Sequence, residues 1–148
     1  MAKRGEKTRA GGTWTEAKFW GYIRAYLRKA MKNWPPKREA SREAIVGWEY
    51  IPKTDRKGKV EYYKIGEKKG KPKTVAIAVR QCSKCGDTYR DDERMIEMDH
   101  KIPCGSLKCA EDLVPFVTRG FCEKDGYRAV CKPCHKVITA EARKKKEV

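Results

Sequence analysis

The sequence lacks any long hydrophobic run. Its longest obvious one, Val75–Val79, is far shorter than the roughly 20 apolar residues that a membrane-spanning helix needs. The basic segment Met1–Lys7 is followed by no apolar stretch, so a secretory signal is not expected. These two absences predict an intracellular, cytoplasmic protein with no membrane partner. In that reducing compartment, cysteines are expected as thiols or metal ligands rather than as disulfides.

Acidic residues are scarce in the first half of the chain. The 148 residues include 36 Lys and Arg against 20 Asp and Glu, a formal net charge of +16. Residues 1–80 hold 22 of the basic and 8 of the acidic side chains, whereas residues 81–148 hold 14 and 12. All seven cysteines and both histidines lie in the second part. The length suits one domain with an appendage, and the charge separates a basic part from a part with reactive groups.

Charge concentrated in one region predicts a polyanionic partner, and nucleic acid is the first choice. The alternative is a basic surface that serves only solubility. An anionic membrane is a weaker explanation, because the basic helix described next has an aromatic face that is typical of a protein core.

The N-terminal region predicts two helices behind an arm. Residues 1–12 are basic and have no apolar periodicity, so we expect a mobile arm. Thr13 is expected to begin a helix, because Glu16 follows it at the capping-box distance. Trp34 stands before two prolines and ends that helix, and a second short helix spans 36–44. The apolar face of the first helix has members three or four residues apart: Trp20, Ile23, Leu27 and Met31.

Trp14, Trp20 and Trp34 raise the alternative of a platform on which bases stack. The helical spacing favours Trp20 as a core residue instead. The basic side of the helix is then the better candidate for contact with phosphate groups: Lys18, Arg24, Arg28, Lys29 and Lys32.

The middle of the chain predicts a basic β-hairpin. Residues 47–59 are expected as a polar connection, 60–65 and 74–80 as strands, and 66–72 as the basic turn between the strands. The predicted domain organisation has three parts: a helical region that contacts nucleic acid (1–50), a linker with the hairpin (51–81) and a cysteine-containing domain (82–148).

Two CxxC pairs, Cys82/Cys85 and Cys131/Cys134, supply four thiolates, which match a structural tetrahedral zinc site. The 45 residues between the pairs exceed the spacer of a simple zinc ribbon, so a folded segment is expected between them. A redox CxxC and two unrelated pairs are the alternatives, but a redox motif needs only one pair. The three remaining cysteines cannot all pair and are expected as buried thiols: Cys104, Cys109 and Cys122.

Asp99 and His100 lie together at the end of a predicted strand, on which alternation places Glu97 and Asp99 on one face. His135 directly follows the last cysteine, so the two CxxC pairs can bring it near position 100. A carboxylate oxygen and an imidazole nitrogen suit a hard divalent ion that keeps positions open for water and phosphate. His100 then remains as a base near neutral pH.

The chain resembles an HNH endonuclease, and more narrowly the zinc-containing type common in bacteriophage genomes. The motifs that carry this resemblance are Asp99-His100-Lys101-Ile102-Pro103 and Cys131-Lys132-Pro133-Cys134-His135, with the first CxxC before them. The resemblance covers residues 82–142. It implies an α+β fold, in which the N-terminal helical region and the basic hairpin lead into a ββα-metal core held by a zinc site of four cysteines. A phage-encoded protein of this type acts in the host cytoplasm.

The resemblance implies where the elements of that core lie. Its first strand would span 95–100, its second strand 127–131, and its helix would begin near Pro133. A further helix is expected within 109–122, which is acidic at its start and then apolar.

The resemblance also implies a reaction, the hydrolysis of a phosphodiester bond in DNA, expected to be double-stranded. Asp99 and His135 would bind a catalytic divalent metal, Mg²⁺ or Mn²⁺, and His100 would take a proton from the attacking water. The metal would polarise the scissile phosphate and stabilise the leaving oxygen. Nearby cations that would suit the phosphate are Lys101, Arg128 and Lys136.

One family residue is missing from the motif. The middle Asn should fall a few residues before Cys131, but the chain has a single Asn, Asn33. Asp125 and Gly126 occupy the matching positions. Asp125 either replaces the Asn, by bonding the loop of His100 or by binding the metal, or is an ordinary turn residue before glycine.

A non-catalytic, zinc-stabilised nucleic-acid-binding protein is the alternative function. Charge and cysteines fit both functions equally. The trio Asp99, His100 and His135 distinguishes them, because a binding module has no need of it. Glu97 is a further carboxylate that would lie near such a site.

Overall fold

The computed structural model describes residues 5–145. Residues 1–4 of the expected arm and residues 146–148 lie outside the described residues. The chain is mixed α/β and divides into two units, each made of two separate stretches of sequence. Unit 1 consists of Met1–Arg42 and Met98–Arg128, and unit 2 consists of Glu43–Glu97 and Ala129–Val148.

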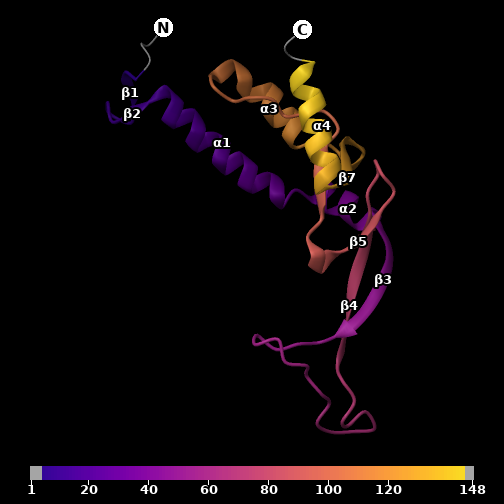
Figure 1. Ribbon diagram of the computed structural model, residues 1–148. Coiled ribbons are helices and arrows are strands. Elements are labelled where there is room, and N and C mark those ends of the chain that lie inside the picture. Colours follow the sequence, from indigo (N-terminus) through magenta and orange to yellow (C-terminus); the bar gives the residue numbers. More distant parts are fainter. Residues whose placement is uncertain (1–4, 146–148) are drawn as a thin grey trace. The chain divides into compact units, whose positions relative to one another are not determined.

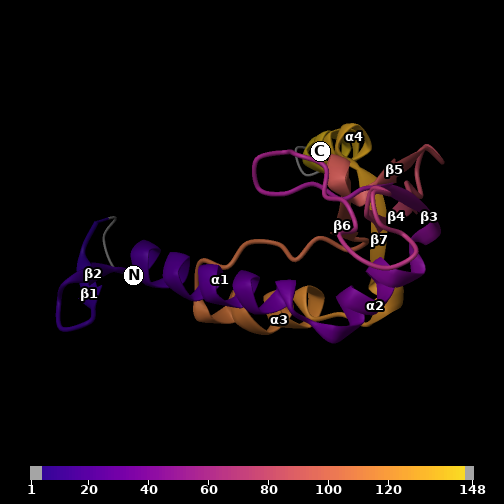
Figure 2. The ribbon, with the colours of Figure 1, turned by 90° about the horizontal axis from the view of Figure 1, so that it is seen from below.

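Unit 1 is built on two helices, α1 (Glu16–Lys32) and α3 (Leu113–Gly120), which lie side by side (Figure 2). Leu107 and Phe116 are buried against Trp20 and Met31 of α1. The predicted apolar face of this helix and the assignment of Trp20 to the core are therefore confirmed. The partly buried residues around this core include Phe19, Ile23, Leu27, Leu113 and Phe121.

Helix α1 begins later than the sequence predicted. The N-cap is Thr15, whose hydroxyl accepts a hydrogen bond from Lys18 N (3.2 Å). The expected start at Thr13 is wrong, because the Thr13 hydroxyl donates to Ala10 O (2.7 Å) and closes a turn instead.

Part of the segment expected as a mobile arm is a strand. β1 (Lys7–Arg9) pairs antiparallel with β2 (Trp14–Thr15). The side chain of Arg9 holds this hairpin to α1, because its Nε donates to Glu16 Oε1 (2.6 Å) and its guanidinium lies over the ring of Phe19.

The expected break between the first two helices is confirmed, since α2 spans Pro35–Glu43. Trp34, in the break, donates from its indole Nε1 to Cys122 O (2.7 Å), and its ring meets Phe121 edge to face. This tryptophan ties the end of α1 to the segment after α3. Two short 3-10 helices complete the unit: η2 (Ala110–Asp112) and η3 (Lys124–Gly126).

Unit 2 contains a three-stranded antiparallel sheet in the order β3-β4-β5 (Figure 1). The strand predicted over 74–80 is confirmed as β4 (Thr74–Gln81). Its predicted partner, 60–65, is wrong, because β4 pairs with β3 (Ile45–Pro52). Residues 47–52 were expected as part of a polar connection, and that expectation is wrong because they belong to β3. Residues 45–51 have the β-branched and aromatic composition of strands, as residues 60–65 do. Residues 60–65 form isolated bridges, Thr54 to Val60 and Tyr62 to Pro72, and the backbone of Glu61 hydrogen-bonds to Lys53 and Lys73.

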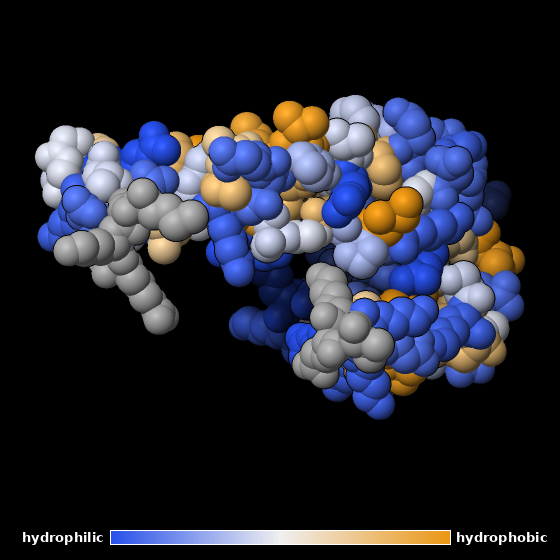
Figure 3. Space-filling view, turned by 90° about the horizontal axis from the view of Figure 1, so that it is seen from above, coloured by the Kyte–Doolittle hydropathy of each residue, from blue (hydrophilic) through white to orange (hydrophobic). Residues whose placement is uncertain are grey.

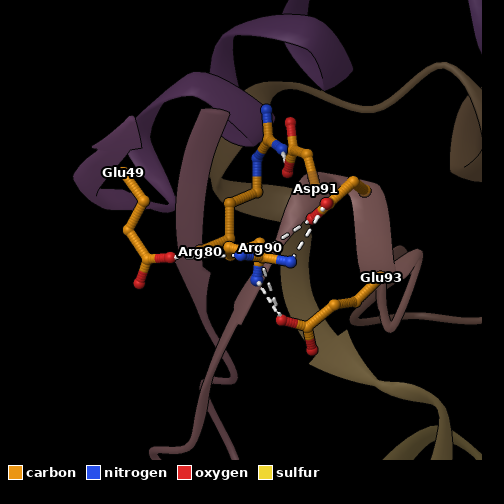
Figure 4. Close-up of polar contacts among 6 residues, drawn as sticks. Glu49, Arg80, Arg90, Asp91 and Glu93 are labelled. Carbon is orange, nitrogen blue, oxygen red and sulfur yellow. Dashed lines mark hydrogen bonds and ion pairs between the residues drawn. The ribbon is translucent and has the colours of Figure 1, made fainter. Parts of the chain in front are cut away.

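Ion pairs attach the third strand, β5 (Thr88–Arg90), and the 3-10 helix η1 (Asp91–Glu93) to this sheet (Figure 4). Arg80 of β4 pairs with Asp91. Arg90 reaches Glu49 of β3 (3.6 Å) and Glu93 (3.7 Å). The two arginines therefore connect all three strands to the turn that follows them.

A second, two-stranded sheet is formed by β6 (Ile96–His100) and β7 (Tyr127–Cys131). Lys101 N donates to Gly126 O at one end of the pair and Lys132 N to Met95 O at the other, so the strands are antiparallel. α4 (Lys132–Lys144) begins directly after β7. These elements, together with α3, lie where the sequence predicted strands and helices.

The surface is mainly polar on the face drawn in Figure 3, where hydrophobic patches are separate and small. Within the described part of the chain, no helix is both long and apolar enough to span a membrane.

Candidate functional site

Four cysteines of unit 2 form a cluster of metal-binding groups. Their sulfur atoms all lie within 4.8 Å of one another, and Cys85 Sγ is 3.9 Å from Cys131 Sγ. Four sulfurs bound at roughly 2.3 Å around a tetrahedral ion are about 3.8 Å apart. The prediction that the two CxxC pairs meet is confirmed, and the cluster can hold a metal ion such as zinc. Its members are Cys82, Cys85, Cys131 and Cys134.

Strand ends and a helix start place these sulfurs. After Cys82 the chain turns, so that Gly86 N donates to Cys82 O (2.9 Å) and Cys82 N donates to Asp87 O (2.8 Å). Gly86 has a φ of +81°, a left-handed conformation that glycine adopts without a steric penalty. Cys131 ends β7 and is the N-cap of α4, which puts Cys134 in the first turn of that helix.

The thiols of the cluster differ in acidity. Burial raises the pKa of the Cys82 thiol, but backbone N–H groups, including those of Cys85 and Cys131, lower it to about 6. At Cys85, the N–H of Asp87 lowers the pKa, whereas loss of water and the three neighbouring thiols raise it to about 12. Negative charge on Cys82 is therefore favoured, whereas negative charge on Cys85 is disfavoured by the neighbouring thiols. A divalent cation removes this competition, because coordinating thiols are deprotonated outright.

The other three cysteines all belong to unit 1. Cys104 and Cys122 are half-buried, but Cys109 is exposed. The expectation of a buried thiol is therefore wrong for Cys109, which stands just before the short helix η2 at the surface.

Asp99 lies near the end of β6 and is held by Arg128. Arg128 donates from Nε (3.1 Å) and Nη2 (2.9 Å) to the same carboxylate oxygen, Oδ2. Both side chains are mostly buried, with 18% exposure for Asp99 and 28% for Arg128. This charge-assisted pair fixes the carboxylate of Asp99, so Arg128, expected as a phosphate-binding cation, contacts a carboxylate in this structure.

His100 is oriented by a backbone carbonyl. Its Nε2 is 3.0 Å from Gly120 O, at the end of α3. A carbonyl oxygen can only accept, so Nε2 carries the hydrogen in this contact. In the neutral imidazole, Nδ1 then has the lone pair and is the basic nitrogen.

The carbonyl of Gly120 has a second donor, the hydroxyl of Tyr127 (3.0 Å). The rings of Tyr127 and His100 are also in contact, with centroids 4.8 Å apart. Burial raises the pKa of Tyr127, and the neighbouring Cys122 raises it further, so the hydroxyl keeps its proton and stays a donor. The buried Tyr127 therefore hydrogen-bonds to the same carbonyl as His100 and also packs against the His100 ring.

His135, in the first turn of α4, has a carboxylate partner in unit 2. Its Nδ1 is 2.8 Å from Glu97 Oε2. An ionised carboxylate accepts only, so Nδ1 carries the hydrogen, and in the neutral ring Nε2 has the lone pair. Metal-ligating histidines commonly donate their other N–H to a carboxylate in this way.

The remaining predicted residues lie at the surface. Asp125 is exposed in the 3-10 turn η3, directly before Gly126. Lys101 and Lys136 are also exposed. The structure therefore places Asp125 in a turn, and its part in catalysis stays a prediction.

The candidate residues are distributed over both units. Asp99, His100 and Asp125 belong to unit 1, whereas His135 and the four clustered cysteines belong to unit 2. The sequence did not reveal Gly120 or Tyr127 as partners of His100. A backbone carbonyl has no sequence signature, although a tyrosine at the start of the second predicted strand was a detectable signal.

Comparison with protein-family models, with curated proteins and with solved structures finds no match for this chain.

Proposed function

We propose that the chain is a metal-dependent DNA endonuclease that hydrolyses phosphodiester bonds of double-stranded DNA, with a ββα-metal core of HNH type formed by β6, β7 and α4. The cysteine cluster holds a structural Zn²⁺. His100 is the general base, and Asp99 and His135 are ligands of a catalytic Mg²⁺ or Mn²⁺.

The observation that carries this proposal is the fixed orientation of both histidines. His100 has Nε2 against the Gly120 carbonyl, and His135 has Nδ1 against the Glu97 carboxylate. The second nitrogen of each ring then has the lone pair that the chemistry needs: Nδ1 of His100 for a proton, and Nε2 of His135 for a metal. A module that only binds nucleic acid has no use for two histidines fixed in this manner.

The residues divide the reaction between them. His100 Nδ1 removes a proton from the water that attacks phosphorus, and the ring is held in place while its charge changes because Gly120 O stays bonded to Nε2. Arg128 holds the Asp99 carboxylate in one orientation. When bound, the divalent metal supplies Lewis-acid stabilisation of charge on the phosphate and on the leaving oxygen.

Binding without cleavage is the second candidate function, and the charge favours it as much as it favours a nuclease. Both units are basic, with 17 basic and 8 acidic residues in unit 1 and 19 and 12 in unit 2. Neutralised phosphates release counterions, so either function predicts binding that weakens steeply with salt.

Cleavage of supercoiled plasmid separates the two functions. Wild-type protein with Mg²⁺ or Mn²⁺ should relax the plasmid, and His100→Ala should lower the rate by about 10²- to 10⁴-fold. His100→Gln is the matched variant, because its amide can still donate to Gly120 O but cannot act as a base. Plasmid binding, circular dichroism and zinc content should be unchanged in both variants.

Omission of the added metal is a cleaner control than EDTA, because a chelator also competes for the zinc. Cleavage by His100→Gln at the wild-type rate would contradict the base assignment. Tight, salt-sensitive binding with no cleavage under any metal would establish the binding module instead.

A further inference from the structure

Two large aromatic side chains are exposed on strand β3. Trp48 is 59% and Tyr50 is 74% exposed. Because successive residues of a strand point to opposite faces, these two share one face. Their register partners on β4 are Ala78 and Ala76, respectively. Alanine is too short to cover a neighbouring ring, so both aromatic rings extend beyond their cross-strand neighbours into solvent.

This face belongs to a ribbon of two strands. β5 pairs only with Val79–Gln81, so the rest of β4 has β3 as its sheet partner (Figure 1). An exposed aromatic pair on such a ribbon gains nothing from core packing. Large exposed apolar groups that lie close together mark interaction sites. The exposed pair Trp48 and Tyr50 is therefore a candidate binding surface.

The ribbon leads into a strongly basic loop, residues 53–73, which has nine basic and three acidic side chains. Glu61 pairs with Lys53 (3.0 Å) and Lys73 (3.7 Å). The other seven basic side chains are exposed: Arg56, Lys57, Lys59, Lys64, Lys68, Lys69 and Lys71.

The backbone of this loop is ordered by its own hydrogen bonds. Asp55 Oδ1 accepts from Lys57 N (2.8 Å) and Lys59 N (2.9 Å). Lys53 N donates to Lys73 O, which joins the two ends of the loop where the ribbon stops (2.8 Å). The backbone that carries the positive charges is therefore ordered, and it joins the ends of the two strands that form the aromatic face.

Rings beside a positively charged track are the combination that binds single-stranded nucleic acid, since bases stack on the rings and phosphates follow the cations. Reading the groove of a duplex requires other side chains, mainly Arg, Lys, Asn and Gln. None of these four occurs in 46–52 or 74–79. A second copy of the chain would bring two basic loops together, which disfavours self-association through this face.

We propose that Trp48 and Tyr50 stack on unpaired bases of a DNA strand whose phosphates are bound by the basic loop 53–73. This single-strand site is separate from the proposed hydrolysis of duplex DNA. Only the choice of DNA over RNA rests on the proposed function; the stacking itself does not.

The test measures binding of the full-length, zinc-loaded protein without Mg²⁺ or Mn²⁺, so that cleavage plays no part. The probes are fluorescein-labelled oligothymidylate, a duplex of equal length and oligouridylate. Trp48→Ala and Tyr50→Ala should each weaken oligothymidylate binding by roughly fivefold or more. Trp48→Phe keeps an aromatic ring and should stay within about threefold of wild type, because stacking tolerates different rings.

Val46→Ala is the matched control, because Val46 is an exposed apolar residue of the same strand without a ring (55% exposed). It should bind all probes as wild type does, and duplex binding should change by less than twofold in every variant. Oligothymidylate should also quench the tryptophan emission of wild type more than that of Trp48→Phe.

Four results would overturn the proposal. Equal losses on the duplex would make this a duplex-binding face, and losses on oligouridylate alone would remove the assignment to DNA. Unchanged binding of every probe would exclude stacking at these residues. A change from dimer to monomer in Trp48→Ala, seen by sedimentation, would make the face a contact between copies of the chain. Circular dichroism of each variant checks that the protein is still folded, so that a loss of binding is not caused by unfolding.

Discussion

The two units solve the problem of a small core in different ways. Unit 1 buries large apolar side chains, among them Trp20, Leu107 and Phe116, between two helices and the chain that packs on them. The buried cluster of unit 2 consists of Cys82, Val130 and Cys131, two of which belong to the metal-binding set. Small domains commonly compensate for a limited core with a metal or with disulfides. Unit 1 therefore depends on packing, and we expect unit 2 to depend on a metal ion bound by the sulfurs.

Tryptophan usage follows the same division. Trp20 of unit 1 is buried in a core, whereas Trp48 of unit 2 is open to solvent. The ring of Trp20 stabilises the core of unit 1, whereas the ring of Trp48 is available to a partner. We expect the cysteine cluster to stabilise unit 2 once it holds a metal.

Metal removal should destabilise unit 2 far more than unit 1. Chelation, or Cys82→Ser, is expected to unfold unit 2 around the cluster, because apparent zinc-binding energies reach about 10–16 kcal/mol in small zinc domains. In two-dimensional NMR spectra, the amide of Val130 should lose its native shift, while the indole signals of Trp20 and Trp34 persist. Elemental analysis should find about one zinc per chain before removal.

The matched control for this substitution is Cys109→Ser, because Cys109 is exposed and lies in unit 1. It should leave zinc content and both sets of NMR signals unchanged. A chain that keeps the Val130 signal without metal would show that unit 2 folds without it.

The opposite perturbation is Phe116→Ala in unit 1. Phe116 is 1% exposed, and deletion of a buried phenylalanine costs about 3–5 kcal/mol. Thermal or urea unfolding should show this loss in the tryptophan signals of unit 1, while the zinc stays bound to unit 2.

Val114→Ala is the control on the same helix, since Val114 is 72% exposed. Its effect should stay within about 0.5 kcal/mol, as for most surface substitutions. Release of zinc by Phe116→Ala would mean that the two units do not unfold independently. It would contradict the assignment of packing to unit 1 and of metal binding to unit 2 as separate sources of stability.

The sequence predicted what depends on local spacing. The CxxC pairs bring their own geometry, and the stripe from Trp20 to Met31 needs only the helical period, so both were found. The pairing of β3 with β4 was missed because strand partners are chosen over long distances. Residues 45–51 and 60–65 both have strand composition, but 47–52 were expected as part of a polar connection, and no local signal decides which segment meets β4.

The candidate site was predictable to the same extent. Asp99, His100 and His135 were identified from motifs, and the possible importance of Glu97 followed from strand alternation. The contacts of the histidines were not predictable, because Gly120 contributes a backbone oxygen and the Glu97–His135 pair joins residues 38 positions apart. Spacing in the sequence identifies the candidate side chains, but tertiary packing determines which partners they contact.

The smallest expected effect tests whether the core of unit 1 also positions His100. A Cβ at Gly120 would overlap the side chain of Met31 and lie 3.6 Å from Cys104 Sγ. Met31 is 4% exposed, so it can move only into a packed core. Gly120→Ala should therefore cost about 1–3 kcal/mol, as overpacking does. The displaced carbonyl should also lower plasmid cleavage without weakening plasmid binding.

Gly21→Ala in α1 makes the same chemical change in a helix of the same unit. There the nearest heavy atom to the new Cβ would be Arg24 Nη2 at 3.9 Å, an ordinary contact. Alanine loses less conformational entropy on folding than glycine, so the substitution should stabilise the protein by about 0.5–1 kcal/mol and leave cleavage unchanged. Opposite signs for the two glycines, measured by thermal unfolding and by cleavage rate, would connect the core of unit 1 to His100. Equal effects would mean that the Gly120 carbonyl is not held by that packing, and the orientation of His100 would need another support.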